Sequence, residues 1–523
     1  MRDLRRRTRR GRRTGRPAQE RRRRGRVRLH PRQRPRSLGR RAAGRHGVPP
    51  RRGVRPGRPR HLPRGRRARP RAGRAVAGQA RPRERLVRPR RMTRLPPALM
   101  PLWPVAKRAH RAATRTVGLA ARAVGDGGPR SVPVRVSPTS RATAAAEPDH
   151  VRLHPVGPPL DLLRPLPAGR PGGLRFWDDV RVLRRPPRSV LEVEGGRLVG
   201  EAAATITPAG TLDRETSPYF GIRRPTEHPV HLRLRYPEPE HVAGTVVSLA
   251  SHASARNYYH SLMDALPRWG LLQELFPDVR PDRVVVGHTT RWDRQLVAMV
   301  GLDALPLVEP THALHLRADR LLVPAIDNQT TLAPPWVSAW LRTHLPARDV
   351  RDKPRRLYVT RGDRPNTRRY VQEDALLPHL ERQGFVRVDP GTMSVQEQID
   401  HFAAAEVVVA PHGAGLVNLT FAPPGVRVLE LFAPRYLNPG YWAIVDNVPD
   451  SRYRYVVAEP VDRLRSERAM QGVQDDVDLP AAVVLEELEH LLAQDADGQE
   501  VPGRTDAGQD GTEHPRSPER GTP

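Results

Sequence analysis

A regular alternation of short apolar runs and longer amphipathic segments, beginning near residue 281, constrains the fold of this chain more than any other feature. Residues 407–410 are four apolar residues in a row, which is typical of a strand buried on both faces of a parallel sheet. Ser394 and Glu397 form a capping box that predicts a helix just before this strand. Further strands are predicted at residues 245–249, 284–286, 321–323, 357–360, 385–388 and 427–431. The alternation predicts an α/β fold with a Rossmann-like domain, in which ligands bind at the carboxyl ends of the strands.

The first hundred residues have the opposite character. They contain 39 arginines and three acidic residues, so 39 − 3 = +36, which equals the formal net charge of all 523 residues. Their apolar residues lack helical or strand spacing, and such a segment cannot bury enough apolar surface to offset the entropy of ordering it. It is either an arm that binds nucleic acid or anionic surfaces, or the product of an over-extended start site or of out-of-frame translation. Met92 and Met100 are candidate later starts, and a later start at another codon is the alternative. The rest of the chain carries 91 − 39 = 52 basic and 55 − 3 = 52 acidic residues, which argues against nucleic-acid binding by the folded part.

These patterns divide the chain into four parts. Residues 1–170 are expected to be a disordered segment rich in Arg, Pro and Gly, and residues 491–523 a disordered tail. Residues 171–340 and 341–490 are each long enough for one domain. A helix over residues 373–382, with Gly384 after its end, belongs to the second of these domains. The last helix is expected to begin near residue 480, with an apolar stripe of Val484, Leu485, Leu488, Leu491 and Leu492.

The composition also excludes several kinds of protein. The chain has no cysteine, so it forms neither disulfides nor thiolate metal sites. Its apolar stretches fall short of the roughly 18–20 residues that span a bilayer, and its charged N-terminus lacks the apolar core of a secretory signal. A cytoplasmic protein is therefore expected, with or without peripheral contact with the inner face of the cell membrane.

Asn257, His260, Asp264 and Arg268 form the first candidate site. Their spacing in a helix places all four on one face. A histidine and a carboxylate one turn apart can supply a general base, with the carboxylate either orienting the imidazole or acting as the base itself. The alternative is a structural His–Asp pair that anchors the helix. Pro267 is expected to kink this helix or to loosen its first half.

A second group of candidates follows the predicted strand at residues 357–360. Arg361, Arg364 and Arg368 come after its end, and arginines at the ligand-binding edge of a sheet suit bidentate recognition of phosphate. Arg361 is the preferred ligand because it is nearest to the strand. The alternative is a solvated, charged loop.

The third group is the turn His412-Gly413-Ala414-Gly415, followed by Asn418. Its two glycines allow the backbone to approach a ligand closely, and the helix N-terminus after them offers N–H groups to a diphosphate. His412 is expected either to contact a phosphate or to cap the turn, and Glu430 either to accept from ribose hydroxyls or to solvate the sheet edge. The run is neither GxGxxG nor GxxxxGK[ST], so it gives little support to dinucleotide or ATP binding. The alternative is a tight turn between strand and helix.

Together these stretches resemble glycosyltransferase family 61, the group often described as capsular polysaccharide biosynthesis proteins. The matching blocks are Asn-Tyr-Tyr-His through Asp at residues 257–264, Tyr-Val-Thr-Arg at 358–361, and residues 407–431. The last block contains Pro-His-Gly-Ala-Gly-Leu-Val-Asn and Phe-Ala-Pro-Pro-Gly and is the most specific. The resemblance covers about residues 175–490.

The resemblance implies a GT-B fold, in which two Rossmann-like domains face a cleft. It also implies inverting transfer of a hexosyl or pentosyl group from a nucleotide sugar to a glycan or lipid-linked glycan, without an obligatory metal or other cofactor. Asn257, His260 and Asp264 would face the acceptor, with Asp264 or His260 as base, and Arg361 and the 412–415 turn would hold the donor diphosphate. Where the family often has a second arginine directly after the first, this chain has Gly362, and Arg364 or Arg368 is expected to replace it.

No metal-binding motif is apparent in the sequence. Asp363 stands in Gly-Asp-Arg rather than in the Asp-x-Asp that metal-dependent glycosyl transfer commonly uses. Two alternatives to an active transferase remain. A catalytically inactive relative would bind a nucleotide or glycan without turnover, and Gly362 is the feature that favours it. A nucleic-acid-binding protein would use the Arg-rich segment, and its binding would depend on salt and on residues 1–100.

Overall fold

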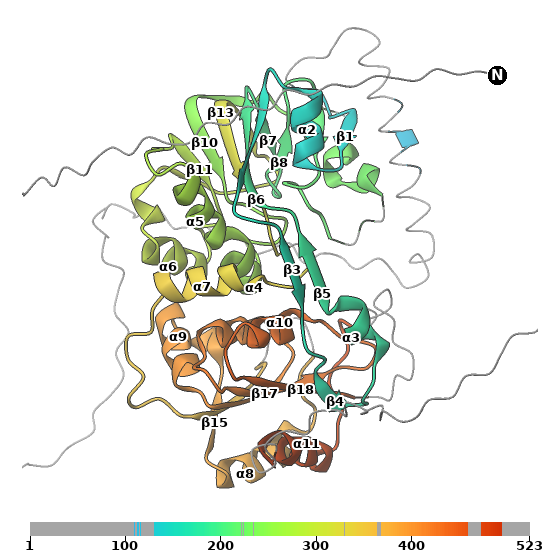
Figure 1. Ribbon diagram of the computed structural model, residues 1–523, viewed down its shortest axis with the longest axis vertical. Helices are drawn as coiled ribbons and strands as arrows, with labels where there is room; N and C mark the ends of the chain where they lie inside the picture. Colours follow the sequence, from blue (N-terminus) through green and yellow to red (C-terminus); the bar gives the residue numbers. More distant parts are fainter. Residues whose placement is uncertain are drawn as a thin grey trace, which may run out of the picture. The chain divides into compact units, whose positions relative to one another are not determined.

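The computed structural model describes residues 130–493, apart from residues 221, 223, 234, 329, 363–367 and 459–471, together with residues 109, 112, 113 and 116. The expectations for the Arg-rich residues 1–100, for Arg364 and for the tail beyond Ala493 lie outside these described residues. Within them the architecture is mixed α/β, with two large sheets and a separate two-stranded sheet of β3 (Leu160–Leu163) and β5 (Val182–Arg185) (Figure 1).

The first large sheet has ten strands and a parallel core. The spatial order of the core is β13-β10-β11-β12, and every neighbouring pair in it is parallel. Antiparallel strands extend the sheet beyond β13, and β1 pairs parallel with β9 at the far edge. The strands are β1 (Arg135–Ser137), β2 (Val151–Val156), β6 (Arg188–Glu194), β7 (Arg197–Val199), β8 (Ala204–Ile206), β9 (Thr211–Asp213), β10 (Glu240–Ser248), β11 (Arg283–Val285), β12 (Leu307–Val308) and β13 (His315–Pro324).

The second large sheet has six strands, all parallel, in the order β15-β14-β16-β17-β18-β4. The chain runs from β14 to β15 on one side and then returns to β16 on the other side of β14. Ligands bind in the crevice at such a reversal, at the carboxyl ends of the strands. The strands are β4 (Ala168–Arg170), β14 (Arg356–Val359), β15 (Phe385–Val388), β16 (Val407–Pro411), β17 (Arg427–Phe432) and β18 (Arg452–Val457).

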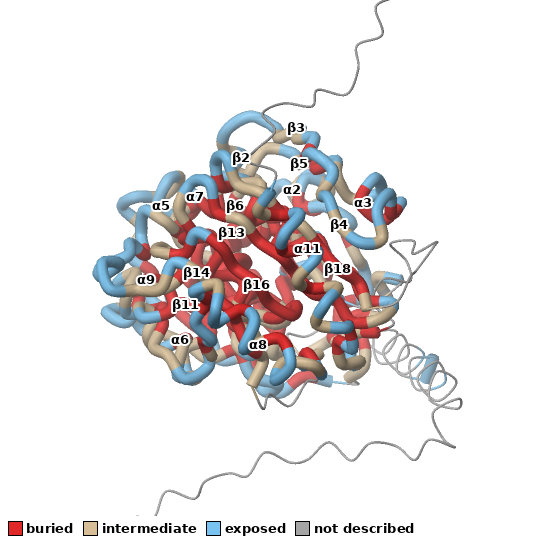
Figure 2. Tube along the Cα trace, turned by 90° about the horizontal axis from the view of Figure 1, so that it is seen from below, coloured by how far each residue is buried: buried red, intermediate tan, exposed pale blue. Residues whose placement is uncertain are grey.

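The helices cover these sheets. Figure 1 shows α5, α6 and α7 beside the first sheet and α8, α10 and α11 beside the second. In Figure 2, β16 and most of β18 are buried, and α10 is buried except at its last residue, so the second core lies along these elements. The α-helices are α2 (Ser140–Ala146), α3 (Arg175–Val180), α4 (Tyr258–His260), α5 (Leu266–Leu275), α6 (Arg291–Met299), α7 (Pro335–His344), α8 (Glu373–Arg382), α9 (Val395–Ala404), α10 (Gly440–Asp446) and α11 (Ala481–Ala493).

The local predictions for the second sheet are confirmed. All five residues of β16 are buried, as the apolar run at 407–410 predicted. Ser394 and Glu397 form both bonds of the capping box at the start of α9. Gly384 follows α8 with φ of +80°, the left-handed conformation expected after a helix end. Helix α11 begins at Ala481 and buries Val484, Leu488 and Leu491 of the predicted stripe.

The prediction that disorder extends to residue 170 is wrong for residues 130–170. Strands β1 to β4 and helix α2 lie in this segment. They are held by partners far along the chain, because β2 pairs with β6 and β4 pairs with β18. In addition, Asp213 accepts from Ser140 Oγ at 3.0 Å in a fully buried position. The second sheet is therefore not built from one continuous segment, since its edge strand comes from residues 168–170.

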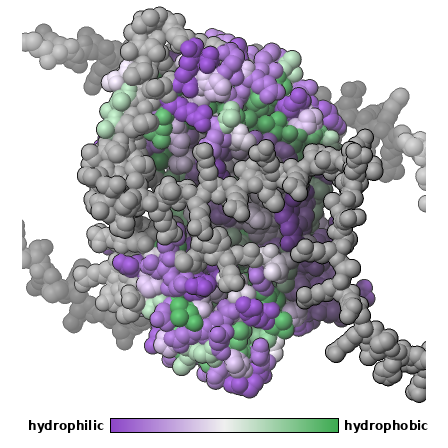
Figure 3. All heavy atoms as spheres, turned by 180° about the vertical axis from the view of Figure 1, so that it is seen from behind, coloured by the Kyte–Doolittle hydropathy of each residue, from purple (hydrophilic) through white to green (hydrophobic). Residues whose placement is uncertain are grey.

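Hydrophilic residues cover much of the described surface on the face shown in Figure 3, with smaller hydrophobic areas between them. Among the described residues, no helix combines the length and the apolar character that a membrane crossing requires.

Candidate active site

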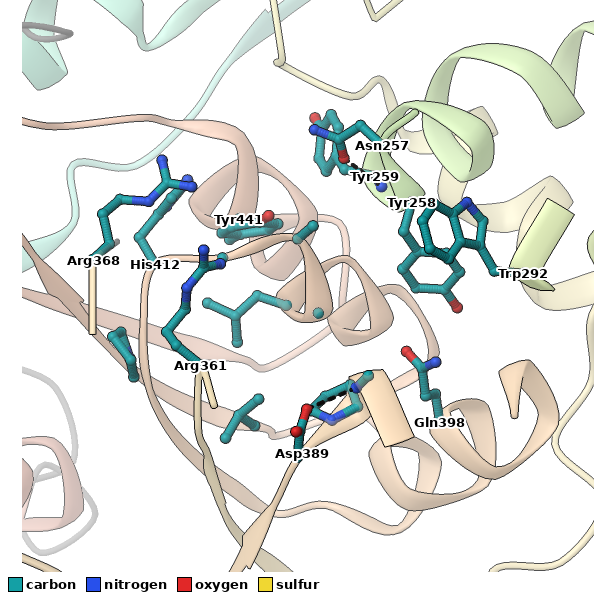
Figure 4. Close-up of a pocket in the computed structure, with 18 of the residues that line it drawn as sticks. Asn257, Tyr258, Tyr259, Trp292, Arg361, Arg368, Asp389, Gln398, His412 and Tyr441 are labelled. Atoms are coloured by element: carbon teal, nitrogen blue, oxygen red, sulfur yellow. Dashed lines mark hydrogen bonds between the residues drawn. The ribbon is translucent and has the colours of Figure 1, made fainter. Parts of the chain in front are cut away.

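A cavity of about 570 Å³ opens where the carboxyl ends of strands from both large sheets meet (Figure 4). One wall consists of residues 256–260, which follow β10, and of Arg291, Trp292 and Gln295 on α6. The facing wall consists of residues that follow β14, β15, β16 and β17. The cavity therefore lies at the edge where parallel sheets bind ligands.

The first wall is shaped by an irregular helix. Asn257 caps α4, and its side chain accepts from the Tyr259 N–H at 3.0 Å. Residues 261–265 then form a π turn in which the Leu266 N–H donates to the Ser261 carbonyl. Pro267 follows directly and has no N–H to continue the α-helical pattern, so the local register widens. The prediction that Pro267 loosens the first half of this helix is confirmed.

His260 and Asp264 form a hydrogen-bonded pair on this wall. His260 Nδ1 lies 2.8 Å from Asp264 Oδ2, and Asn328 Nδ2 donates to Asp264 Oδ1 at 2.8 Å. An ionised carboxylate only accepts, so Nδ1–H donates and Nε2 keeps its lone pair. The side chain of His260 lines the cavity and is 14% exposed, whereas that of Asp264 is 3% exposed and lies behind it. Among the described residues, none bonds His260 Nε2.

Arg268 shares the helix face of Asp264 but does not reach the cavity. Its Nε donates to the Pro324 carbonyl at 2.8 Å and its Nη1 to the Ala250 carbonyl at 2.7 Å. Burial lowers its pKa to about 9, so it stays charged near neutral pH. Arg268 therefore ties α5 to the chain beyond β10 and to the last residue of β13. Arg268 does not line the cavity, so it cannot contact a sugar acceptor bound there.

Arg361 leaves the end of β14 and crosses the glycine turn on the facing wall. A Cβ atom at Gly413 would lie 2.1 Å from Arg361 Nη1. Gly413 has an extended backbone with φ of −173°, so the glycine is required for space and not for its conformation. The space at Gly415 is less restricted, since a Cβ there would lie 3.1 Å from Pro390 Cγ. The turn and the guanidinium of Arg361 thus form one surface of the cavity, together with Ala414.

The missing second arginine has a structural explanation. Gly362 has φ of +54°, and a Cβ there would lie 2.9 Å from Asp389 Oδ2, so an arginine at this position would be strained. Arg368 instead lines the cavity, with its guanidinium carbon 5.1 Å from the centre of the Tyr436 ring. Figure 4 shows Arg361 and Arg368 on the same side of the cavity as His412.

His412 and Glu430 form a second His–carboxylate pair. His412 Nδ1 lies 2.5 Å from Glu430 Oε1, and its Nε2 lies 3.0 Å from the Tyr436 hydroxyl. Tyr453 donates to Glu430 Oε2 at 2.6 Å. Burial lowers the pKa of His412 well below its ordinary value and raises the pKa of Glu430 to about 8. A protonated Glu430 therefore donates to neutral His412, whose Nε2–H donates to Tyr436.

This arrangement corrects two sequence-based expectations. Glu430 is fully buried behind His412, so it neither contacts a ribose nor solvates the sheet edge. Both ring nitrogens of His412 are bonded within the protein, so no ring N–H is left for a phosphate. Asn418 is also fully buried, and its Nδ2 donates to the Gly415 carbonyl at 2.9 Å. It supports the turn from behind.

Several lining residues were missed by sequence reasoning. Trp292 lies on α6 and Gln398 on α9, where nothing in the local pattern distinguishes them from ordinary helix residues. Tyr436, Asn438 and Tyr441 follow β17 in a stretch that also contains two prolines and a glycine. Aromatic and amide side chains in a turn-rich stretch after a strand are a pattern that could have identified these three.

Residues 258–429 match the family model described as Glycosyltransferase 61. No protein of curated function matches the chain. The matched segment begins at Tyr258 and ends within β17, so it contains His260, Asp264, Arg361 and the 412–415 turn.

Proposed function

Residues 258–429 belong to glycosyltransferase family 61, and from this premise we propose that the cavity transfers a sugar from a nucleotide-sugar donor to a glycan, with inversion and without an obligatory metal. The observation that carries the proposal is the pairing of two chemistries across one cavity. His260 presents an open ring nitrogen on one wall, and Arg361 and Arg368 present positive charge on the other.

The donor is assigned to the wall formed by the second sheet. A diphosphate leaving group accumulates negative charge as it departs, and guanidinium groups and backbone N–H groups stabilise such charge. Arg361 and Arg368 line the cavity beside the start of the 3₁₀ helix η7 (Ala414–Phe421), whose first N–H groups lack partners within the helix. Charge stabilisation is thus available from side chains and backbone, which supports a reaction that does not depend on a metal.

The acceptor is assigned to the wall formed by α4, with Asn257 at its start. In the proposed step, His260 Nε2 removes the proton from an acceptor hydroxyl while the hydroxyl oxygen bonds to the anomeric carbon of the donor sugar. The bond from that carbon to the diphosphate oxygen breaks, and its electron pair leaves with the diphosphate. Asp264 accepts from Nδ1–H and stabilises the imidazolium that forms, so it is a positioning residue. Attack on the face opposite the leaving group inverts the anomeric centre.

A GT-B arrangement is part of the same proposal. Two parallel strand cores, each with a carboxyl-end edge lining the cavity, are what two Rossmann-like domains facing a cleft require. A surface or capsular glycan as acceptor, free or lipid-linked, and a cytoplasmic location are taken from the family resemblance. Arg368 on the cavity wall weakens the alternative of an inactive relative, because the feature that favoured it was the glycine at position 362.

The proposal is tested by nucleotide release from UDP-, GDP-, TDP- and CMP-sugars, using the full chain and acceptor extracts. Release from one donor that persists in EDTA and yields an inverted product by NMR is expected. Arg361→Ala should abolish it, whereas Arg356→Ala, which removes an arginine that donates to the Gln383 carbonyl away from the cavity, should not. Binding of a donor by folded protein without any release would instead support an inactive relative.

A further inference from the structure

We propose that the part of the cavity between Tyr258, Trp292 and Gln398 binds the nucleobase of the donor and selects a base with a carbonyl group beside Gln398. Uracil, thymine and guanine carry such a group where cytosine and adenine carry an amine. The inference rests on the proposed function, because it takes a nucleotide sugar as the ligand.

The orientation of the Gln398 amide follows from its neighbours. The Gly415 carbonyl can only accept, and it lies 2.9 Å from Asn418 Nδ2, which fixes which end of the Asn418 amide carries the nitrogen. The same nitrogen donates to Gln398 Oε1 at 2.9 Å. Asn418 Oδ1 accepts from the Tyr258 hydroxyl at 3.0 Å, which agrees with this orientation. The oxygen of Gln398 therefore faces Asn418.

Gln398 Nε2 is left as a donor at the cavity. The residue is 6% exposed and lines the cavity, and among the described residues none accepts from this nitrogen. Because this nitrogen is accessible at the cavity, a ligand that supplies an acceptor there gains a hydrogen bond. The amide cannot turn round to accept from a ligand, because its nitrogen would then face the Asn418 nitrogen. Gln398 therefore offers a donor, and no acceptor, to a ligand in this part of the cavity.

Trp292 supplies a flat surface beside this donor. It is half-buried and lines the cavity, and its ring centre lies 6.5 Å from that of Tyr258, at an angle of 73°. Figure 4 shows Trp292 and Tyr258 beside Gln398, across the cavity from Arg368 and His412. Nucleobases stack on aromatic side chains with useful affinity. The layout thus separates a stacking site from the positive charge proposed for the diphosphate.

A sugar ring fits this location less well than a base. Sugar hydroxyls both donate and accept, so their recognition calls for donors and acceptors together. Gln398 provides donors alone. Its link through Asn418 to Gly415 also connects it to the turn proposed to hold the diphosphate, and a nucleotide would contact both parts.

The test is the affinity of the full chain for UDP and CDP, measured by calorimetry. The base of UDP carries a carbonyl group and an adjacent ring N–H. The base of CDP carries an amine and an adjacent ring nitrogen without a hydrogen, and the two ligands are otherwise identical. UDP is expected to bind about tenfold more tightly, since an unmatched buried donor costs on the order of one power of ten in affinity. Gln398→Glu keeps an oxygen for Asn418 and replaces the donor by an acceptor, so it should reverse the preference.

Gln295→Glu is the matched control. Gln295 lies on the same cavity wall as Trp292, but its amide is already bonded at both ends, to the Val395 N–H and to the Arg291 carbonyl. This variant adds the same charge, so it should weaken UDP and CDP by the same factor and leave their ratio unchanged. Trp292→Leu should likewise weaken both ligands by about tenfold with little change in ratio.

The outcomes separate this inference from the proposed function. Equal affinities of UDP and CDP for the wild-type chain would overturn the inference alone, because nucleotide binding would persist. The same holds if Gln398→Glu leaves the ratio unchanged while the variant retains its thermal stability. Displacement of UDP by a free sugar that contacts Trp292 would also overturn it. Failure of every nucleoside diphosphate to bind would overturn both the inference and the proposed function.

Discussion

The two walls of the cavity carry the same pair of groups, a histidine bonded through Nδ1 to a carboxyl group, with different surroundings. His260 and Asp264 lie on the wall that follows β10, and Nε2 of His260 has no partner among the described residues. His412 and Glu430 lie on the wall of the second sheet, and Nε2 of His412 is bonded to Tyr436. Only the first pair has a ring nitrogen available to a substrate.

This difference shows that a hydrogen-bonded His–carboxylate pair does not by itself indicate a catalytic role. Glu430 is fully buried with a pKa raised to about 8, so the second pair is neutral near neutral pH and acts as part of the scaffold. Asp264 accepts from both Nδ1–H and the Asn328 amide, as an ionised carboxylate does. The free ring nitrogen and the charge of its partner distinguish a candidate base from a support.

The largest expected effect comes from removing the open ring nitrogen. His260→Gln should lower the rate of transfer about 10²- to 10⁴-fold, because general base catalysis contributes factors of this size. Donor affinity should stay within a factor of about two, because the donor is assigned to the other wall. Single-turnover rates and calorimetric donor affinities measure the two quantities separately.

His412→Gln is the matched comparison for that variant. It removes the other histidine and should mainly lower the thermal stability, since it disturbs a buried hydrogen-bond network. The account of the two pairs would be wrong if His412→Gln lost transfer at full stability while His260→Gln retained it.

Asp264→Asn should have the next largest effect. A hydrogen bond to a charged group contributes roughly 1.5–3 kcal/mol, so loss of the charge that stabilises the imidazolium should lower the transfer rate about 10- to 100-fold. The fall should appear in the single-turnover rate, with donor affinity within a factor of about two, because Asp264 lies behind His260 and the donor is assigned to the other wall. An unchanged rate in a variant of wild-type thermal stability would show that Asp264 is only structural.

Gly413→Ala tests whether the wall formed by the second sheet binds the donor. A Cβ at this position would lie 2.1 Å from Arg361 Nη1, so the guanidinium must move. Donor affinity should fall about tenfold, as expected for one displaced charge-assisted hydrogen bond. Gly425→Ala is a control for a glycine away from the cavity, where an added Cβ meets nothing within 4 Å, although its φ of +81° predicts some loss of stability. Unchanged donor affinity in Gly413→Ala would argue against Arg361 as a donor ligand.

Glu430→Gln gives the smallest effect, on the pH dependence of stability. The pKa of this carboxyl group is about 8 in the fold and 4.5 ordinarily, so the unfolded chain releases the proton first as pH rises between these values. The free energy of unfolding should therefore fall by about 1 kcal/mol between about pH 7 and pH 8 in the wild-type chain. Urea unfolding of Glu430→Gln, which keeps a donor for His412, should lack this fall. An equal fall in both proteins would assign it to other groups.

The parts of the fold that could be predicted are those determined by neighbours in sequence. The apolar run of β16, the capping box at Ser394 and the glycine after α8 each depend on a few adjacent residues. Strands β2 and β4 could not be predicted, because their partners are β6 and β18 and the segment around them is rich in Arg and Pro. An edge strand of this kind is stabilised by pairing that no local pattern reveals.

The sequence identified the groups of residues near the candidate site, but it did not show which of them line the cavity and which are buried behind it. His260, Arg361 and the glycine turn line the cavity, as their positions after strands or on one helix face suggested. Arg268 and Glu430 are turned into the protein, where buried carbonyl groups accept from Arg268 and the Tyr453 hydroxyl donates to Glu430. Sequence spacing predicts the face of a helix or strand on which a polar residue lies. Whether that residue lines a cavity or contacts a buried partner depends on the tertiary packing, which the spacing does not show.

The most direct measurement is the position of bound UDP in an experimental structure of the full chain. The account predicts that the diphosphate lies within hydrogen-bonding distance of Arg361 and of the N–H groups of residues 413–415, with the terminal phosphate directed toward His260. It also predicts that the uracil lies on Trp292 beside Gln398. UDP bound away from this cavity, or a terminal phosphate directed away from His260, would contradict the central claim that the two walls together form a glycosyl-transfer site.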